Sequence, residues 1–139
     1  MVFFEVKNWG EQVYSWQFTP LYGGVHMETL QPEQGQPEVR TVGYRTLETD
    51  AERYAQLERI LDRLPDPAPD SNACENFVPD FAYGIIRLSR SATTTEISWN
   101  SGCMDRDYAG FLSTLREADS LVSGWARDLP ISRTEKVRQ

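Results

Sequence analysis

An amphipathic helical pattern over residues 49–64 limits this chain to folds that give the helix an apolar surface to cover. Thr49 and Glu52 have the spacing of a capping box, and Pro65 ends the pattern. Charged side chains fill the opposite face, which we interpret as solvated and not as a binding motif. The apolar stripe consists of Tyr54, Leu57, Ile60, Leu61 and Leu64.

A second helical pattern begins after Asp105 and ends before Pro130. We expect Asp105 to cap this helix, while Asp107 favours the positive end of the helix dipole. Two aspartates so close together superficially resemble a metal site, but a helix cap explains them more simply. The apolar stripe consists of Tyr108, Phe111, Leu112, Leu115, Ala118, Val122 and Trp125.

Strand patterns supply the surface that the two helices need. A run of strands, a helix, a β-hairpin and a helix favours an α+β fold, in which both amphipathic helices pack on one face of an antiparallel sheet. The strand-forming segments alternate between apolar and polar residues or are rich in β-branched and aromatic ones. They are residues 11–18, 24–30 and 38–46 and the hairpin 81–99, which turns at Ser91 and Ala92.

The length of 139 residues fits one domain with its own core. We expect this domain over residues 1–131, followed by a polar, mobile tail over residues 132–139. No apolar run is long enough to span a bilayer. Residues 65–80 form a proline-rich loop, which either has a binding role or covers the core as a strap.

Two adjacent glycines, Gly23 and Gly24, precede His26, which is the only histidine of the chain. A phosphate loop needs glycines that open a helix, whereas β-patterned residues follow here, so we interpret the glycines as a turn. A catalytic histidine needs a nucleophile or an orienting carboxylate, and Glu28 is the only local candidate. We expect His26 to be an ordinary histidine on a strand surface; the alternative is an enzyme that uses His26 or Cys103.

The two cysteines of the chain, Cys74 and Cys103, are predicted to form a disulfide, because the hairpin 81–99 brings the segments around it side by side. Together with His26 they lack the short spacings of a zinc site, so we expect no metal and no cofactor. A disulfide favours an oxidising compartment. We therefore expect a periplasmic or secreted protein, with Met1 standing where a signal sequence was removed, and a cytoplasmic protein as the alternative.

Fourteen basic and twenty-one acidic residues give a net charge of −7, which disfavours binding to nucleic acid. The imbalance lies in residues 1–39, where Lys7 is the only basic residue, and in residues 64–86, which contain none. We expect this acidic surface to meet a protein partner with a basic surface, although it could serve solubility alone. The predicted partner contacts are Glu33, Glu38, Asp66 and Asp70, with Trp9, Tyr22 and Phe77 as hydrophobic anchors.

These observations favour a non-catalytic protein-binding module, such as an inhibitor or accessory protein of the bacterial envelope. The alternative is an intracellular acidic interaction protein, of immunity or phage-antagonist type, that occupies a basic cleft of its target. The redox state of the cysteines distinguishes these two classes. A pocket that joins His26 to carboxylates would instead favour an enzyme, for which the sequence alone indicates no catalytic residues.

Overall fold

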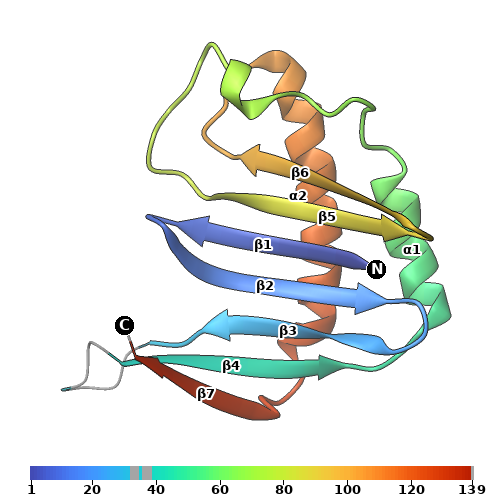
Figure 1. Ribbon diagram of the computed structural model, residues 1–139, viewed down its shortest axis with the longest axis vertical. Coiled ribbons are helices and arrows are strands. Elements are labelled where there is room, and N and C mark those ends of the chain that lie inside the picture. The colour runs from blue at the N-terminus through green and yellow to red at the C-terminus, as the bar shows by residue number, and fades with distance from the viewer. Residues whose placement is uncertain (32–34, 36–38, 139) are drawn as a thin grey trace.

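The computed structural model describes residues 1–31, 35 and 39–138, and shows an α+β fold with a seven-stranded antiparallel sheet and two α-helices. Both helices lie behind the sheet in Figure 1. No helix in the described part of the chain is long and apolar enough to cross a membrane. The elements are β1 (Val2–Asn8), β2 (Glu11–Thr19), β3 (Gly23–Thr29), β4 (Val39–Leu47), α1 (Ala51–Leu61), the 3-10 turn η1 (Ser71–Ala73), β5 (Tyr83–Arg90), β6 (Thr93–Asn100), α2 (Arg106–Arg127) and β7 (Arg133–Arg138).

The strands follow the order β6-β5-β1-β2-β3-β4-β7, and each runs antiparallel to its neighbours. β1 lies inside the sheet, between β2 and β5, although our sequence analysis predicts no strand before residue 11. Its alternate residues Val2, Phe4 and Val6 are buried in the core. This is the period-two pattern of a strand with one buried face.

The core lies between the helices and one face of the sheet. Phe4 of β1 stacks against Trp16 and Trp99, with ring centroids 5.6 and 5.3 Å away. Leu57 of α1 and Val122 of α2 are fully buried in the same cluster. The largest fully buried side chains include the aromatic rings of Trp16, Phe18, Tyr108 and Phe111, and burial of apolar surface is the main stabilising term in folding.

The helix α1 spans Ala51–Leu61, a shorter range than the predicted 49–64. Its N-cap is Asp50 and not Thr49. The Asp50 carboxylate accepts hydrogen bonds from the backbone N–H groups of the second and third residues after it, at 3.1 and 3.0 Å. A carboxylate caps a helix as well as a hydroxyl does, so neighbouring Thr and Asp compete for the position.

Residues 133–138 form the strand β7, which corrects the mobile tail predicted over residues 132–139 for the part of it that the structure describes. β7 pairs with β4 and forms the lower edge of the sheet in Figure 1. Tyr44 of β4 holds this strand, because its hydroxyl donates to Glu135 at 3.0 Å and its ring lies 3.9 Å from the guanidinium of Arg133. Polar side chains do not prevent a segment from satisfying its backbone groups on a sheet edge.

Candidate functional site

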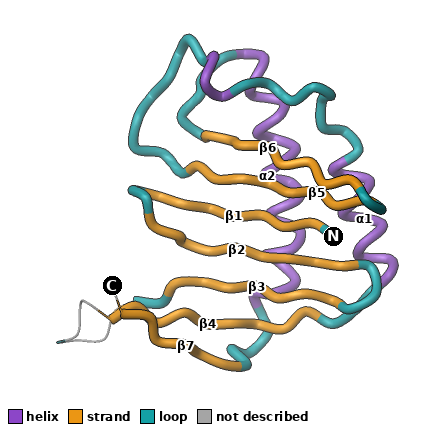
Figure 2. The backbone as a smooth tube through the Cα atoms, in the orientation of Figure 1, coloured by secondary structure: helices purple, strands orange, loops and turns teal. Residues whose placement is uncertain are grey.

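The central loop, residues 65–82, joins α1 to β5 along one end of the molecule (Figure 2). It contains the proline-rich segment 65–80. The first half of the loop borders the edge strand β6, and the second half reaches the turn between β1 and β2. Two neighbouring surfaces therefore depend on how this loop is held in place.

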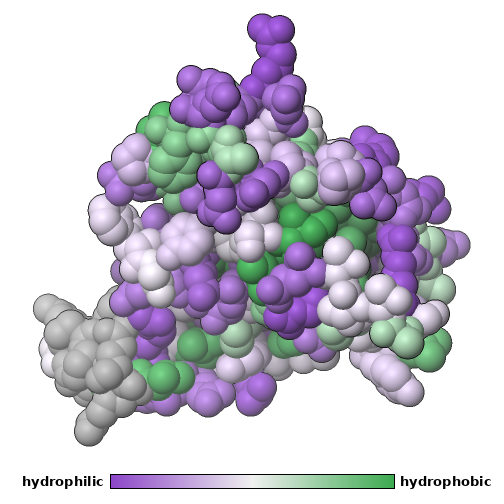
Figure 3. All heavy atoms as spheres, turned by 45° about the horizontal axis from the view of Figure 1, so that its top comes forward, coloured by the Kyte–Doolittle hydropathy of each residue, from purple (hydrophilic) through white to green (hydrophobic). Residues whose placement is uncertain are grey.

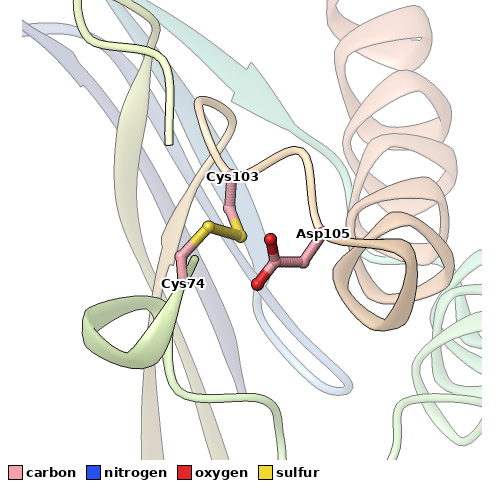
Figure 4. A group of neighbouring side chains, drawn as sticks. All are labelled: Cys74, Cys103 and Asp105. Atoms are coloured by element: carbon pink, nitrogen blue, oxygen red, sulfur yellow. A yellow bond between two sulfur atoms is a disulfide. The ribbon is translucent and has the colours of Figure 1, made fainter. Parts of the chain in front are cut away.

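The predicted disulfide between Cys74 and Cys103 is confirmed, with the two Cα atoms 5.9 Å apart. Beside it lies Asp105 (Figure 4), whose carboxylate accepts hydrogen bonds from the backbone N–H groups of Glu75 and Asn76 at 2.9 and 2.8 Å. These donors hold the pKa of Asp105 below its usual range. Asp105 is the N-cap residue of α2, but its side chain makes no cap hydrogen bond and fastens the central loop instead.

Cys74, Cys103 and Asp105 each place a ligand atom within 4.8 Å of the others, a spacing that could hold a metal ion. The two sulfurs are bonded to each other, however, and both carboxylate oxygens accept hydrogen bonds. The disulfide and Asp105 together therefore hold the central loop against the start of α2, and we call them the disulfide clamp. A backbone hydrogen bond of 2.8 Å from Val78 to Gly102 extends this clamp toward the second half of the loop.

The second half of the loop and the β1–β2 turn enclose a cleft of about 180 Å³. Trp9, at the tip of the turn, is 76% exposed, and Phe77 in the loop is 48% exposed. The backbone N–H of Gly10 donates to the Tyr83 hydroxyl at 2.9 Å, which fixes the turn against β5. This aromatic cleft is lined by Asn8, Trp9, Phe77, Pro79, Asp80, Phe81, Tyr83 and Asn100.

Trp9 adopts a backbone conformation that tryptophan normally avoids. Its φ of 54° lies in the left-handed region, as does the φ of 77° at Gly10. Asn8 and Glu11 pair across this two-residue turn, and such hairpin turns prefer Asn-Gly or Asp-Gly. A left-handed residue with a side chain costs roughly 1–2 kcal/mol, and the exposed ring recovers little of this through packing. Folding alone therefore gives no reason for a tryptophan at this position.

The first half of the loop and β6 enclose a groove of about 710 Å³. Leu64, Leu88 and Ile97 contribute apolar side chains to it. Asp66 and Asp70, two of the predicted partner contacts, line it from the loop side. Figure 3 brings this end of the molecule forward and shows apolar residues among hydrophilic ones. This β6 groove is lined by residues 61, 62, 64–72, 88, 90, 93 and 95–98.

Several carboxylates of the acidic first half of the chain are paired. Glu11 lies 2.9 Å from Arg40, and Glu28 forms an ion pair with Arg45. Both arginines belong to β4, which follows the acidic segment in the sequence but lies next to β3 in the sheet. The acidic side chains that line the aromatic cleft and the β6 groove come mainly from the central loop.

Two of the three predicted aromatic anchors meet, because Trp9 and Phe77 line the same cleft. Tyr22 is 87% exposed, but it lies in the turn between β2 and β3, at the opposite end of β2 from Trp9 (Figure 1). Glu33 and Glu38 lie outside the residues that the structure describes. The predicted contacts therefore divide between two ends of the sheet, and the central loop gathers most of those that are described.

A polar hollow of about 350 Å³ lies where α2 crosses β2 and β3. It contains His26, which is 7% exposed and so corrects the strand-surface histidine that we expect from sequence. The imidazole Nε2 lies 3.3 Å from the Ser123 hydroxyl oxygen, and this hydroxyl donates to Asp119 at 3.1 Å. Asp119 also accepts hydrogen bonds from the Trp16 indole at 2.9 Å and from the Tyr14 hydroxyl.

The hollow joins His26 to Ser123 and to two carboxylates, those of Glu28 and Asp119, which is the arrangement that the sequence analysis gives as favouring an enzyme. In a hydrolytic triad the carboxylate orients the histidine, and the histidine takes the proton of the serine. Here the Ser123 hydroxyl donates a hydrogen bond to Asp119 instead of to His26, and both carboxylate oxygens of Asp119 accept hydrogen bonds. Nδ1 of His26 is buried without a hydrogen-bond partner among the described residues. The network differs from a triad in its order of hydrogen bonds, and it ties α2 to β2 and β3.

The buried imidazole should make stability depend on pH. Burial lowers the pKa of His26 below its usual 6.5, and the nearby carboxylates of Glu28 and Asp119 only partly oppose this. The unfolded chain then binds a proton that the folded chain does not, so the free energy of unfolding should fall as the pH drops below about 6.5. Urea denaturation between about pH 5 and 7 should show a shallower pH dependence for His26→Gln than for the wild type. If the free energies of unfolding of His26→Gln and the wild type changed equally with pH, the lowered pKa of His26 would be contradicted.

Sequence reasoning missed the exposure of Phe81, and it assigned Asp105 to a helix cap and not to the central loop that its carboxylate holds. The sequence analysis places Phe81 in the predicted hairpin 81–99, but β5 begins only at Tyr83, and Phe81 is 48% exposed at the aromatic cleft. The preceding Pro79 and Asp80 were a signal that the strand starts later.

Comparison with known proteins found no matching family, no matching curated protein and no matching solved structure. Function is therefore inferred from the residues of this chain.

Proposed function

We propose that this chain is a non-catalytic protein-binding module, which recognises a partner with a basic surface through its central loop. The aromatic cleft supplies exposed anchors, and the adjoining β6 groove supplies carboxylates. Protein interfaces commonly combine an aromatic centre with a polar or charged rim. The net charge of −7 supports a basic protein partner over a nucleic acid.

The exposed ring of Trp9 carries this proposal. Trp9 occupies a left-handed turn position that Asn or Gly fills at lower cost, and it remains 76% exposed. Phe77 stands beside it because the disulfide clamp holds the loop there. Residues that carry local strain without a gain in packing are concentrated at functional sites.

The disulfide supports a periplasmic or secreted location, because disulfides persist in oxidising compartments. In that setting the proposed role is an inhibitor or accessory protein of the bacterial envelope. The alternative role is an intracellular acidic interaction protein, of immunity or phage-antagonist type, that occupies a basic cleft of its target. Free thiols in unreduced native material would favour this alternative.

Replacing Trp9 by asparagine should separate binding from folding. Asn-Gly suits the turn better than Trp-Gly, so Trp9→Asn should be as stable as the wild type or up to about 1 kcal/mol more stable. The same change should abolish retention of a specific partner from an extract of the source organism, because the anchor is lost. Urea denaturation and affinity capture followed by mass spectrometry measure the two effects.

Tyr22→Asn is the matched control, since it removes an even more exposed aromatic residue at the other end of the sheet. It should leave retention of the partner unchanged. If Trp9→Asn retains the same protein as the wild type, the aromatic cleft is not the recognition surface. A marked loss of stability in Trp9→Asn would show that the ring has a structural role.

A further inference from the structure

We propose that the β6 groove receives an extended, lysine- or arginine-rich segment of the partner, which adds to the sheet as a strand along the edge of β6. This proposal rests on the proposed function and specifies how the partner binds. Strand addition uses the β6 groove, whereas Trp9 belongs to the aromatic cleft. Each proposal can therefore be contradicted without the other.

The edge of β6 is open for pairing. Among the strands that the structure describes, β6 pairs with β5 alone. The backbone N–H of Asn100 points away from β5, because it donates to the Tyr108 hydroxyl at 2.9 Å. Backbone groups alternate in direction along an antiparallel strand, so those of Ser98, Glu96 and Thr94 point to the same open side. An exposed row of such groups is a template for an added strand.

The groove lies directly beside this edge. Ile97 of β6, Leu88 of β5 and Leu64 contribute apolar side chains to it, and the central loop forms its other wall. A strand that paired with β6 would place alternate side chains into the groove and the others toward solvent. Main-chain hydrogen bonds would then supply affinity, and the groove would supply selectivity.

The charges of the groove select a cationic segment. Its lining contains the carboxylates of Asp62, Asp66, Asp70 and Glu96. Asp62 forms an ion pair with Arg90 at 2.9 Å, and Glu96 forms one with Arg87 at 2.6 Å. The net negative charge of the groove therefore comes from Asp66 and Asp70. Asp66 and Asp70 are exposed on the loop wall, facing the space that the added strand would occupy. Opposite charges placed this way favour both encounter and the correct partner.

The other edge of the sheet has the opposite character. β7 carries Arg133 and Lys136, and its one acidic residue is Glu135. Basic side chains on an edge strand discourage the addition of a further basic strand. A cationic segment should therefore pair with β6 and not with β7.

The test uses ¹⁵N-labelled full-length protein and an end-blocked eight-residue peptide of alternating lysine and valine. We expect saturable NMR shifts at the backbone amides of Thr94, Glu96 and Ser98. A peptide of alternating glutamate and valine should cause none. A lysine–valine peptide with N-methyl groups on alternate residues, which lacks the donors for pairing, should bind about tenfold more weakly.

Ser98→Pro removes an outward N–H while the backbone partners of β5 stay in place, as proline allows on an edge strand. It should weaken peptide binding about tenfold, while Ser98→Ala should bind as the wild type does. Asp66→Asn with Asp70→Asn should weaken binding about three- to fivefold at low salt. Asparagine can keep the Asp70 cap on η1.

Equal affinity for the lysine peptide and its N-methylated form would overturn strand addition, and that result does not depend on whether Ser98→Pro folds. Shifts confined to β7 or to the aromatic cleft would also overturn it. Association of the protein with itself through β6, seen as concentration-dependent sedimentation that Ser98→Pro abolishes, would identify a second copy as the occupant and overturn the proposal. If the lysine–valine peptide does not bind while Trp9→Asn still abolishes retention of the partner, the proposed binding module is kept. That result contradicts strand addition alone.

Discussion

Replacing Leu57 by alanine should lower the free energy of unfolding by about 2–5 kcal/mol. Leu57 is 0% exposed and lies in the core cluster that joins α1 to the sheet and to α2. The substitution removes apolar contacts and leaves a cavity that close-packed neighbours cannot fill completely. Urea denaturation followed by tryptophan fluorescence should show a lower midpoint with an unchanged slope.

Arg59→Ala provides the control on the same helix. Arg59 is exposed, and alanine is a better helix former than arginine, so the change should stay within about 0.5 kcal/mol. Equal losses for Leu57→Ala and Arg59→Ala would contradict the burial of this face of α1. A changed slope in Leu57→Ala would instead indicate that the transition is no longer two-state.

Removing the disulfide should be comparably severe. Cys74 and Cys103 are 29 residues apart, and closing a loop of that size stabilises the folded state by roughly 3–4 kcal/mol in the chain-entropy model. Cys74→Ser with Cys103→Ser should therefore lower the free energy of unfolding by about this amount. The loss should also loosen the central loop, because Asp105 then holds it through hydrogen bonds without the covalent link.

Wild-type protein unfolded with and without reductant is the matched comparison for the serine variant. Reduced wild type and the variant should have similar stabilities, since both lack the same link. Alkylation before reduction, followed by intact-mass measurement, should label no thiol in native material. Two labelled thiols would contradict the disulfide and shift the proposed location toward the cytoplasm.

The two helices could be predicted from sequence because the patterns that indicate a helix are local. An apolar residue every third or fourth position, ended by Pro65 or Pro130, depends only on neighbours along the chain. The boundary of α1 was less accurate, since Thr49 and Asp50 are both competent caps. The disulfide was also predictable, because a hairpin sets which segments lie side by side.

The strands at the two ends of the chain were harder to predict. Val2, Phe4 and Val6 alternate as a buried strand does, yet our sequence analysis predicts no strand over these residues. β7 has no apolar pattern at all and becomes a strand because β4 offers it an unpaired edge. Pairing of backbone groups with a distant segment cannot be seen in the pattern of side chains.

The sequence by itself determined the two helices, most of the strands, the disulfide and the exposure of Trp9 and Phe77, because period, turn chemistry and cysteine placement are local properties. Only the tertiary structure decided which charges and aromatic rings share a surface. It paired Glu11 and Glu28 with arginines of β4, and it brought the central loop beside both the β1–β2 turn and the edge of β6. Strand order sets these neighbours, and it follows from packing of the whole core rather than from distance along the chain.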